Sequence, residues 1–167
     1  MQRRKFIQNA ALFGSLALID PMEIIAGTKM VKDFPIVRVA KGKRNFESDF
    51  IEKTIAEFQK NVKDKELGWL FNNCFPNTLD TTVTFSQKNG RPDTYVITGD
   101  IDAMWLRDSS AQVWPYMAFA GKDTKLKNLI AGVINRQTEY ILKDPYANAF
   151  YNDPNKKTEC TTDHTDT

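Results

Sequence analysis

The chain has 167 residues, of which 41% are hydrophobic and 26% charged, which is enough for one ordinary domain with a packed core. The formal net charge is only +2, so the surface lacks the strong field that attracts nucleic acid or acidic membranes, and we expect neither partner. Cys74 and Cys160 lack the spacing of a zinc site, and a single histidine, His164, argues against a Ser-His-Asp triad or a multi-histidine metal centre.

The first residues have the features of an export signal. Arg3, Arg4 and Lys5 precede a short apolar run from Ala10 to Ile19, the order of basic and hydrophobic regions that secretory signals use. The arginine pair also fits the twin-arginine type of address. The alternative is an amphipathic or buried first helix. We expect residues 1–27 to be a signal peptide without a stable membrane anchor, and the protein to be exported to the periplasm or the exterior of a bacterium.

The next segment predicts an extended lead-in followed by a helix. Residues 28–46 are basic, are broken by Pro35 and Gly42 and show no periodic face. A helix is predicted to begin near Ser48, whose side chain can cap free backbone amides. Its apolar residues form one stripe, which is typical of a helix that faces a core: Phe50, Ile51, Ile55, Phe58 and Val62.

A second helix and a hairpin come next. The helix is predicted from Glu66 to Asn73, ending before Pro76 because the residue ahead of a proline is pushed out of the helical region. The polar string from Asn77 to Thr82 is interpreted as a loop. Beyond it, two segments with alternating apolar residues flank an Asn89-Gly90 turn signal, which predicts a small β-hairpin.

The remaining pattern is helical and then polar. Helical spacing returns from Asp102 to Phe119, although Pro115 must kink or restart the helix. A further helix is predicted from about Lys125 to Leu142, with Ile134 and Ile141 among its apolar residues. The tail from Lys143 to Thr167 is polar, and we expect it to end without a closing element. Antiparallel helix pairs joined by loops therefore predict an incomplete helical array.

One strip, TGDIDAMWLRDSSAQVWPY from Thr98 to Tyr116, concentrates charged groups. Asp100, Asp102 and Asp108 could act as general acids or bases, because glycoside hydrolysis needs two carboxylates across the scissile bond. They could equally cap the helix start or pair with a cation such as Arg107. The residues alone leave both interpretations open.

Aromatic and polar groups in the same strip favour carbohydrate binding. Trp105 could belong to the core or could stack on a sugar. Sugars present vicinal hydroxyls and an apolar ring face, and groups suited to both lie within MWLRD, after a turn at Gly99.

Two stretches resemble a known family. They are NCFPNTLDTTV, Asn73 to Val83, and GRPDTYVITGDIDAMWLRDSSAQVWPY, Gly90 to Tyr116. Both are similar to the N-terminal part of the glycoside hydrolase family 125 proteins, and the likeness runs from about Glu47 to Asp153. Those proteins are exo-acting, metal-independent α-mannosidases with activity toward α-1,6-linked mannose. The resemblance implies an (α/α)6 barrel, hydrolysis with inversion, a mannose-containing glycan as partner and no cofactor.

The resemblance also implies which residues bind sugar: Asp100, Trp105, Arg107 and Asp108. Arg107 and Asp108 are expected to hydrogen-bond hydroxyls of the terminal mannose, and Trp105 to shape the pocket or stack in it. Asp102 stands at a variable position of the signature, so we expect a cap without a catalytic role.

The catalytic groups themselves are not identified in this chain. Inversion needs an acid and a base roughly 6.5 to 9.5 Å apart, and the resemblance implies that both are glutamates downstream of Thr167. Residues 47–167 are therefore expected to be a truncated, all-α N-terminal part of the catalytic domain, a partial (α/α)6 barrel with a hairpin insertion that is inactive alone. The alternatives are a non-catalytic carbohydrate-binding module, or an (α/α)6 glycosidase that acts on glucose or uronic acids.

Overall fold

The computed structural model describes residues 34–157. The chain divides into two compact units, Met1–Pro35 and Ile36–Thr167, and the fold below is that of the second. The predicted signal peptide over residues 1–27 and the last ten residues of the predicted tail lie outside the described part.

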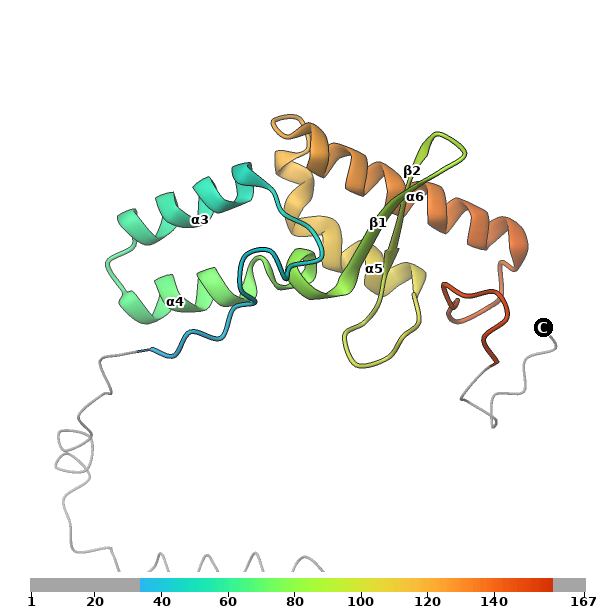
Figure 1. Cartoon of the computed structure of the whole chain (residues 1–167), viewed down its shortest axis with the longest axis horizontal. Coiled ribbons are helices and arrows are strands. Elements are labelled where there is room, and N and C mark those ends of the chain that lie inside the picture. Colours follow the sequence, from blue (N-terminus) through green and yellow to red (C-terminus); the bar gives the residue numbers. More distant parts are fainter. Residues whose placement is uncertain (1–33, 158–167) are drawn as a thin grey trace, which may run out of the picture. The chain divides into compact units, whose positions relative to one another are not determined.

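The described part is mostly helical and contains one two-stranded sheet (Figure 1). Its elements in chain order are α3 (Asp49–Asn61), α4 (Lys65–Cys74), a π-helical turn η2 (Thr78–Thr82), β1 (Val83–Lys88), β2 (Arg91–Val96), α5 (Leu106–Val113), a 3-10 segment η3 (Trp114–Phe119) and α6 (Thr124–Lys143). Among the described helices, none is long and apolar enough to cross a membrane.

The first helix begins where the sequence predicts. The Ser48 hydroxyl accepts a hydrogen bond from the Ile51 N–H at 3.1 Å and caps α3. Ile51 is buried in the core. On the same helix, the Phe58 ring stacks on Phe71 of α4 with centroids 4.1 Å apart. The apolar stripe of α3 therefore pairs this helix with α4.

The segment between α4 and the hairpin is not a loop, so that prediction is wrong. α4 ends at Cys74, but Phe75 keeps a helical backbone (φ −59, ψ −46) in front of the proline. In η2, the hydroxyls of Thr81 and Thr82 donate to the carbonyls of Asn77 and Thr78 at 2.7 and 2.9 Å. Because these hydroxyls bond to the backbone of the preceding turn, a polar segment can remain helical.

The hairpin forms around the predicted turn. Val83 pairs with Val96 at its base. Asn89 (φ 53) and Gly90 (φ 74) both have positive φ, as the two-residue turn that suits a twisted hairpin requires. Register and turn therefore follow from the sequence.

The long helix α6 packs closely on the hairpin (Figure 1). The Thr94 hydroxyl donates to the Leu129 carbonyl at 2.8 Å. A Cβ at Gly132 would lie 2.3 Å from Thr94 Oγ1, so the helix can approach the strand only because this residue is glycine. Ile134 and Ile141, two of the apolar residues on which this helix was predicted, are 56% and 49% exposed.

Part of the polar tail belongs to the core. Met104 and Phe150 exchange two backbone hydrogen bonds of 2.9 and 3.0 Å. The Phe150 ring stacks on Tyr140 of α6 at a centroid distance of 4.2 Å and is 7% exposed. The tail therefore contributes a core contact at Phe150, and the prediction that it ends without a closing element stays a prediction, because its last ten residues lie outside the described part.

Buried ion pairs hold the lead-in. The Arg38 guanidinium donates to Asp80 Oδ2 at 2.7 Å and to Glu52 Oε1 at 2.6 Å. Arg44 donates to the same Glu52 oxygen at 3.0 Å. Burial disfavours the charged forms of Arg38 and Glu52, but the hydrogen bonds and opposite charges of their partners outweigh this effect of burial. They raise the pKa of Arg38 and lower the pKa of Glu52. The lead-in is thus fixed to α3 and η2 by charge.

Candidate functional site

The candidate strip covers the loop after β2, the whole of α5 and the start of η3, and its candidate sugar-binding residues lie in the loop and the first turn of α5. Gly99 has φ +126, a conformation that glycine adopts readily. The helix predicted from Asp102 begins only at Leu106, because Met104 is extended and bonded to Phe150. Neither Asp100 nor Asp102 is therefore a helix cap, which corrects the expectation for Asp102 and removes this alternative for Asp100.

Asp102 anchors the loop instead. Its Oδ2 accepts from Lys156 Nζ at 3.0 Å, and its Oδ1 accepts from the Tyr95 hydroxyl at 3.4 Å. Burial, followed by the Asp102 charge, raises the pKa of Tyr95, so this phenol stays protonated as a donor. Asp102 thereby ties the loop to β2 and to the tail.

Arg107 and Asp108 lie next to each other near the start of α5. Arg107 Nη2 is 3.4 Å from Asp108 Oδ2, and the side chains are 90% and 37% exposed. An exposed pair of this kind contributes about 0 to 1 kcal/mol to folding. Their polar groups are therefore available to a ligand at little cost to the fold.

The other two predicted residues flank this pair in sequence. Trp105 precedes α5 and is partly buried, and its carbonyl accepts from the Ser109 hydroxyl at 2.6 Å. Asp100 is exposed in the loop. Among residues 34–157 the structure brings Arg107 and Asp108 into contact. Trp105 and Asp100 lie on the same strip, but within these residues they form no hydrogen bond or ion pair with the two side chains.

Two glutamines, Gln137 of α6 and Gln112 within the strip itself, hold the strip in place, and the sequence pattern did not indicate them. Gln137 Nε2 of α6 lies 2.9 to 3.0 Å from three acceptors in α5: the Leu106 carbonyl and the hydroxyls of Ser109 and Ser110. Gln112 Nε2 donates to the Ile97 carbonyl at 3.0 Å. The sequence did contain one signal for Gln137: it is a polar residue on the side of α6 that packs on α5.

Two buried polar atoms of the strip have no hydrogen-bond partner in the described part of the chain: Thr98 Oγ1 in the loop and Gln112 Oε1 in α5. Buried polar groups are nearly always paired in folded proteins, so each exception calls for an explanation. The strip therefore carries polar capacity that the described fold does not use.

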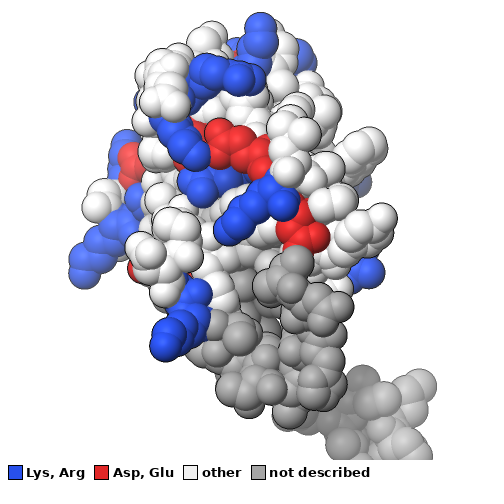
Figure 2. Space-filling model, turned by 90° about the vertical axis from the view of Figure 1, so that its right-hand side faces the viewer, with Lys and Arg blue, Asp and Glu red and all other residues white. Residues whose placement is uncertain are grey.

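Charge on one face of the molecule is mixed. On the face seen in Figure 2, acidic side chains lie directly beside basic ones. Within residues 34–157, no three His, Cys, Asp or Glu side chains are grouped as a metal ion would require. The groups of the strip, a guanidinium, carboxylates and an indole, are suited to hydrogen bonding and apolar contact.

Comparisons with known proteins point to one family. The sequence profile described as metal-independent α-mannosidase (GH125) matches residues 64–167. The "Meiotically up-regulated gene 157 protein" of Schizosaccharomyces pombe (strain 972 / ATCC 24843) is 44% identical over 117 residues, which are 70% of this chain and 23% of that protein.

A solved structure agrees. A metal-independent α-mannosidase of Streptococcus pneumoniae, in a non-productive substrate complex with α-1,6-mannobiose, is 41% identical with a TM-score of 0.58, over 65% of this chain and 25% of that one. The present chain thus spans about a quarter of the length of these two relatives.

Proposed function

Because the chain belongs to glycoside hydrolase family 125, the metal-independent α-mannosidases, we propose that it is part of an exo-acting α-mannosidase. Its strip forms one wall of the pocket for the terminal mannose of an α-1,6-linked glycan. The observation that carries this proposal is the exposed Arg107–Asp108 pair at the start of α5. It lies inside the matched residues, and the Streptococcus pneumoniae relative was solved with α-1,6-mannobiose.

The groups of the strip match the chemistry of a pyranose. The Arg107 guanidinium has only donors and the Asp108 carboxylate only acceptors. Side by side, they can form hydrogen bonds with neighbouring sugar hydroxyls, because each hydroxyl both donates and accepts. The Trp105 indole offers an apolar face for the ring carbons, and the exposed Asp100 supplies a further acceptor.

We assign sugar binding, and not bond cleavage, to the strip. Inversion requires a protonated acid at the leaving oxygen and a base for water, roughly 6.5 to 9.5 Å apart. Asp102 is held by Lys156, and we assign Asp108 to the hydroxyls of the sugar beside Arg107, so neither is assigned the role of base. The acid and base belong to other carboxylates of the whole enzyme.

The family membership supports a proposal for the architecture, and the first residues of the chain support one for the location. We propose that α3 to α6 form part of an (α/α)6 barrel, and that the hairpin is an insertion in it. The arginine pair and apolar run at residues 3–19 support export to the periplasm or the exterior.

The proposal is tested by calorimetric titration of the 167-residue chain with α-1,6-mannobiose, together with an assay of its hydrolysis. We expect weak binding at the strip, with a Kd on the order of millimolar, and Asp108→Asn should weaken it. Asp49→Asn, an exposed acid at the start of α3, serves as the matched control and leaves binding unchanged.

Three outcomes would change the assignment. Turnover that disappears with Asp108→Asn would contradict a purely binding role for the strip. Tight binding by a cooperatively folded chain without turnover would favour a carbohydrate-binding module. Preference for a glucoside or a uronide would contradict mannose as the substrate.

A further inference from the structure

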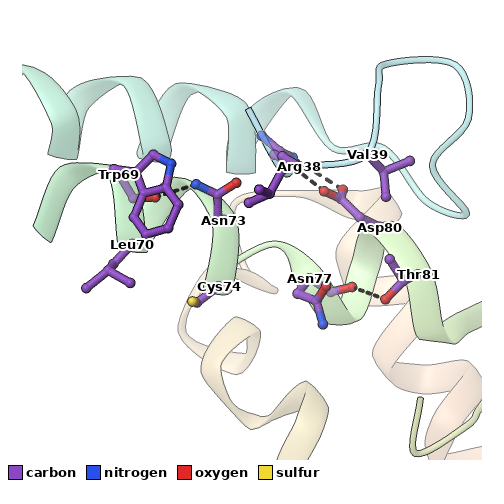
Figure 3. A pocket seen from close by; sticks show the side chains of 10 residues that line it. Arg38, Val39, Trp69, Leu70, Asn73, Cys74, Asn77, Asp80 and Thr81 are labelled. Carbon is purple, nitrogen blue, oxygen red and sulfur yellow. Dashed lines mark hydrogen bonds and ion pairs between the residues drawn. The ribbon is translucent and has the colours of Figure 1, made fainter. Parts of the chain in front are cut away.

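We propose that this chain has a binding pocket for a neutral sugar ring between the lead-in, α4 and η2. This lead-in pocket has a volume of about 460 Å³ (Figure 3), within the range of small-molecule sites. Half of its ten lining residues belong to the family stretch Asn73 to Val83. It shares no lining residue with the strip.

The walls of the pocket combine apolar side chains with polar groups, as the binding of a sugar requires. Val37 and Val39 of the lead-in and Leu70 of α4 are apolar, and Trp69 adds an indole on the α4 side (Figure 3). Small-molecule sites combine such apolar walls with a few polar groups at fixed positions. The ring carbons of a pyranose fit walls of this kind.

The polar groups are carboxamides and a hydroxyl. Asn73 Nδ2 donates to the Trp69 carbonyl at 2.7 Å, which fixes its amide plane and leaves Oδ1 to accept. Figure 3 places this amide between Trp69 and Arg38. The Asn77 side chain is exposed and makes no hydrogen bond within the described residues. Thr81 Oγ1 donates to the Asn77 carbonyl at 2.7 Å and keeps its lone pairs for a ligand.

The charges in the pocket do not favour an anionic ligand. Its two ionic groups, Arg38 and Asp80, are 8% and 3% exposed and bonded to each other at 2.7 Å. Arg38 also donates to Glu52, so its guanidinium has no unmet charge to offer a phosphate or a carboxylate. A neutral ligand that both donates and accepts hydrogen bonds, such as a pyranose, is the better match. Only the choice of mannose over other sugars rests on the proposed function.

Cys74 provides a local probe, because its thiol is exposed on the lining of the pocket. In the full chain carrying Cys160→Ser, the rate of maleimide labelling of Cys74 reports whether the pocket is occupied. We expect methyl α-mannoside to slow labelling several-fold and saturably, and an equal concentration of sorbitol to leave the rate unchanged. Slowing by sorbitol to the same extent, or no slowing by the mannoside up to its solubility limit, would overturn the proposal.

Variants separate this pocket from the strip. Asn73→Leu and Asn77→Ala should each abolish protection of Cys74; Asn77 is exposed, so its variant remains informative if Asn73→Leu fails to fold. Arg107→Ala should leave protection intact even if all binding at the strip is lost. Loss of protection in Arg107→Ala would assign the effect to the strip and overturn the pocket. Equal protection by methyl α-glucoside would support the pocket and contradict only its preference for mannose.

Discussion

The interface of α6 with the hairpin and the strip before α5 use polar residues in opposite ways. At the interface, Arg136 and Asp93 are buried partners joined by two hydrogen bonds, and Thr94 bonds to α6. In the strip, Arg107 is 90% exposed, and Thr98 Oγ1 is buried without a partner in the described residues.

The difference indicates which polar groups the fold needs. A buried charge without its partner costs several kcal/mol, so the interface tolerates little change. An exposed charge contributes almost nothing to stability, so its place in the strip calls for another explanation. A ligand provides that explanation, and substitutions in the two regions should therefore differ in what they change.

The largest expected effect is on the buried ion pair. Arg136→Met leaves Asp93, which is 5% exposed, without its cation, and should lower the free energy of unfolding by about 3 to 5 kcal/mol. Lys88→Met is the matched control, because Lys88 and Glu139 form a pair of 2.6 Å with side chains 52% and 50% exposed. It should cost less than about 1 kcal/mol in urea unfolding. Equal losses of unfolding free energy in the two variants would contradict the difference between buried and exposed ion pairs.

A smaller loss is expected where α6 touches β2. In Gly132→Ala the new Cβ meets Thr94 Oγ1 at 2.3 Å and backbone atoms of Asp93 and Thr94 at 2.9 Å. Overpacking should outweigh the gain in helix propensity and cost about 1 to 3 kcal/mol. Gly121→Ala, whose Cβ meets nothing within 4 Å, should unfold at the unchanged denaturant midpoint. A stabilised Gly132→Ala would show that the contact can relax.

Acid should weaken the anchor of the lead-in. The contacts of Glu52 with Arg38 and Arg44 lower its pKa from 4.5, so its contribution to stability is complete above about pH 4.5 and is lost as the pH falls through the lowered pKa. Glu52→Gln should cost about 1 kcal/mol or less at pH 7, and the difference from the unsubstituted protein should vanish in acid. If the difference in stability between Glu52→Gln and the unsubstituted protein persists at low pH, the carboxylate charge is not what stabilises the lead-in. Glu57→Gln, an exposed acid on the same helix, is the control.

The smallest effect on stability is expected in the strip. Arg107→Ala removes a side chain that is 90% exposed, and its free energy of unfolding should stay within about 0.5 kcal/mol of the original. Thermal and urea unfolding measure this value. A loss comparable to that of Gly132→Ala would mean that the strip, too, is a structural element.

Local signals in the sequence predicted much of the fold. The Ser48 cap, the Asn89-Gly90 turn and the helical period of α6 each act within a few residues, so they could be identified without the tertiary structure. The family resemblance was confirmed by the match over residues 64–167.

Contacts distant in sequence decided the rest. Asp80 appeared to belong to a polar loop, because its partner Arg38 lies in another segment. Asp102 appeared to begin a helix, because its partner Lys156 lies in the tail. The four sugar-binding residues remain predictions from the signature, whereas the support from Gln137 was visible only in the structure.

The most direct test of a binding strip is the Kd of α-1,6-mannobiose for Arg107→Ala, measured by NMR titration against the unsubstituted chain. We predict an affinity at least about tenfold weaker, equivalent to about 1.4 kcal/mol, in a variant whose free energy of unfolding is unchanged. An unchanged Kd would contradict a sugar-binding role for Arg107. A weaker Kd accompanied by a comparable loss of stability would contradict the separation of the strip from the structural core.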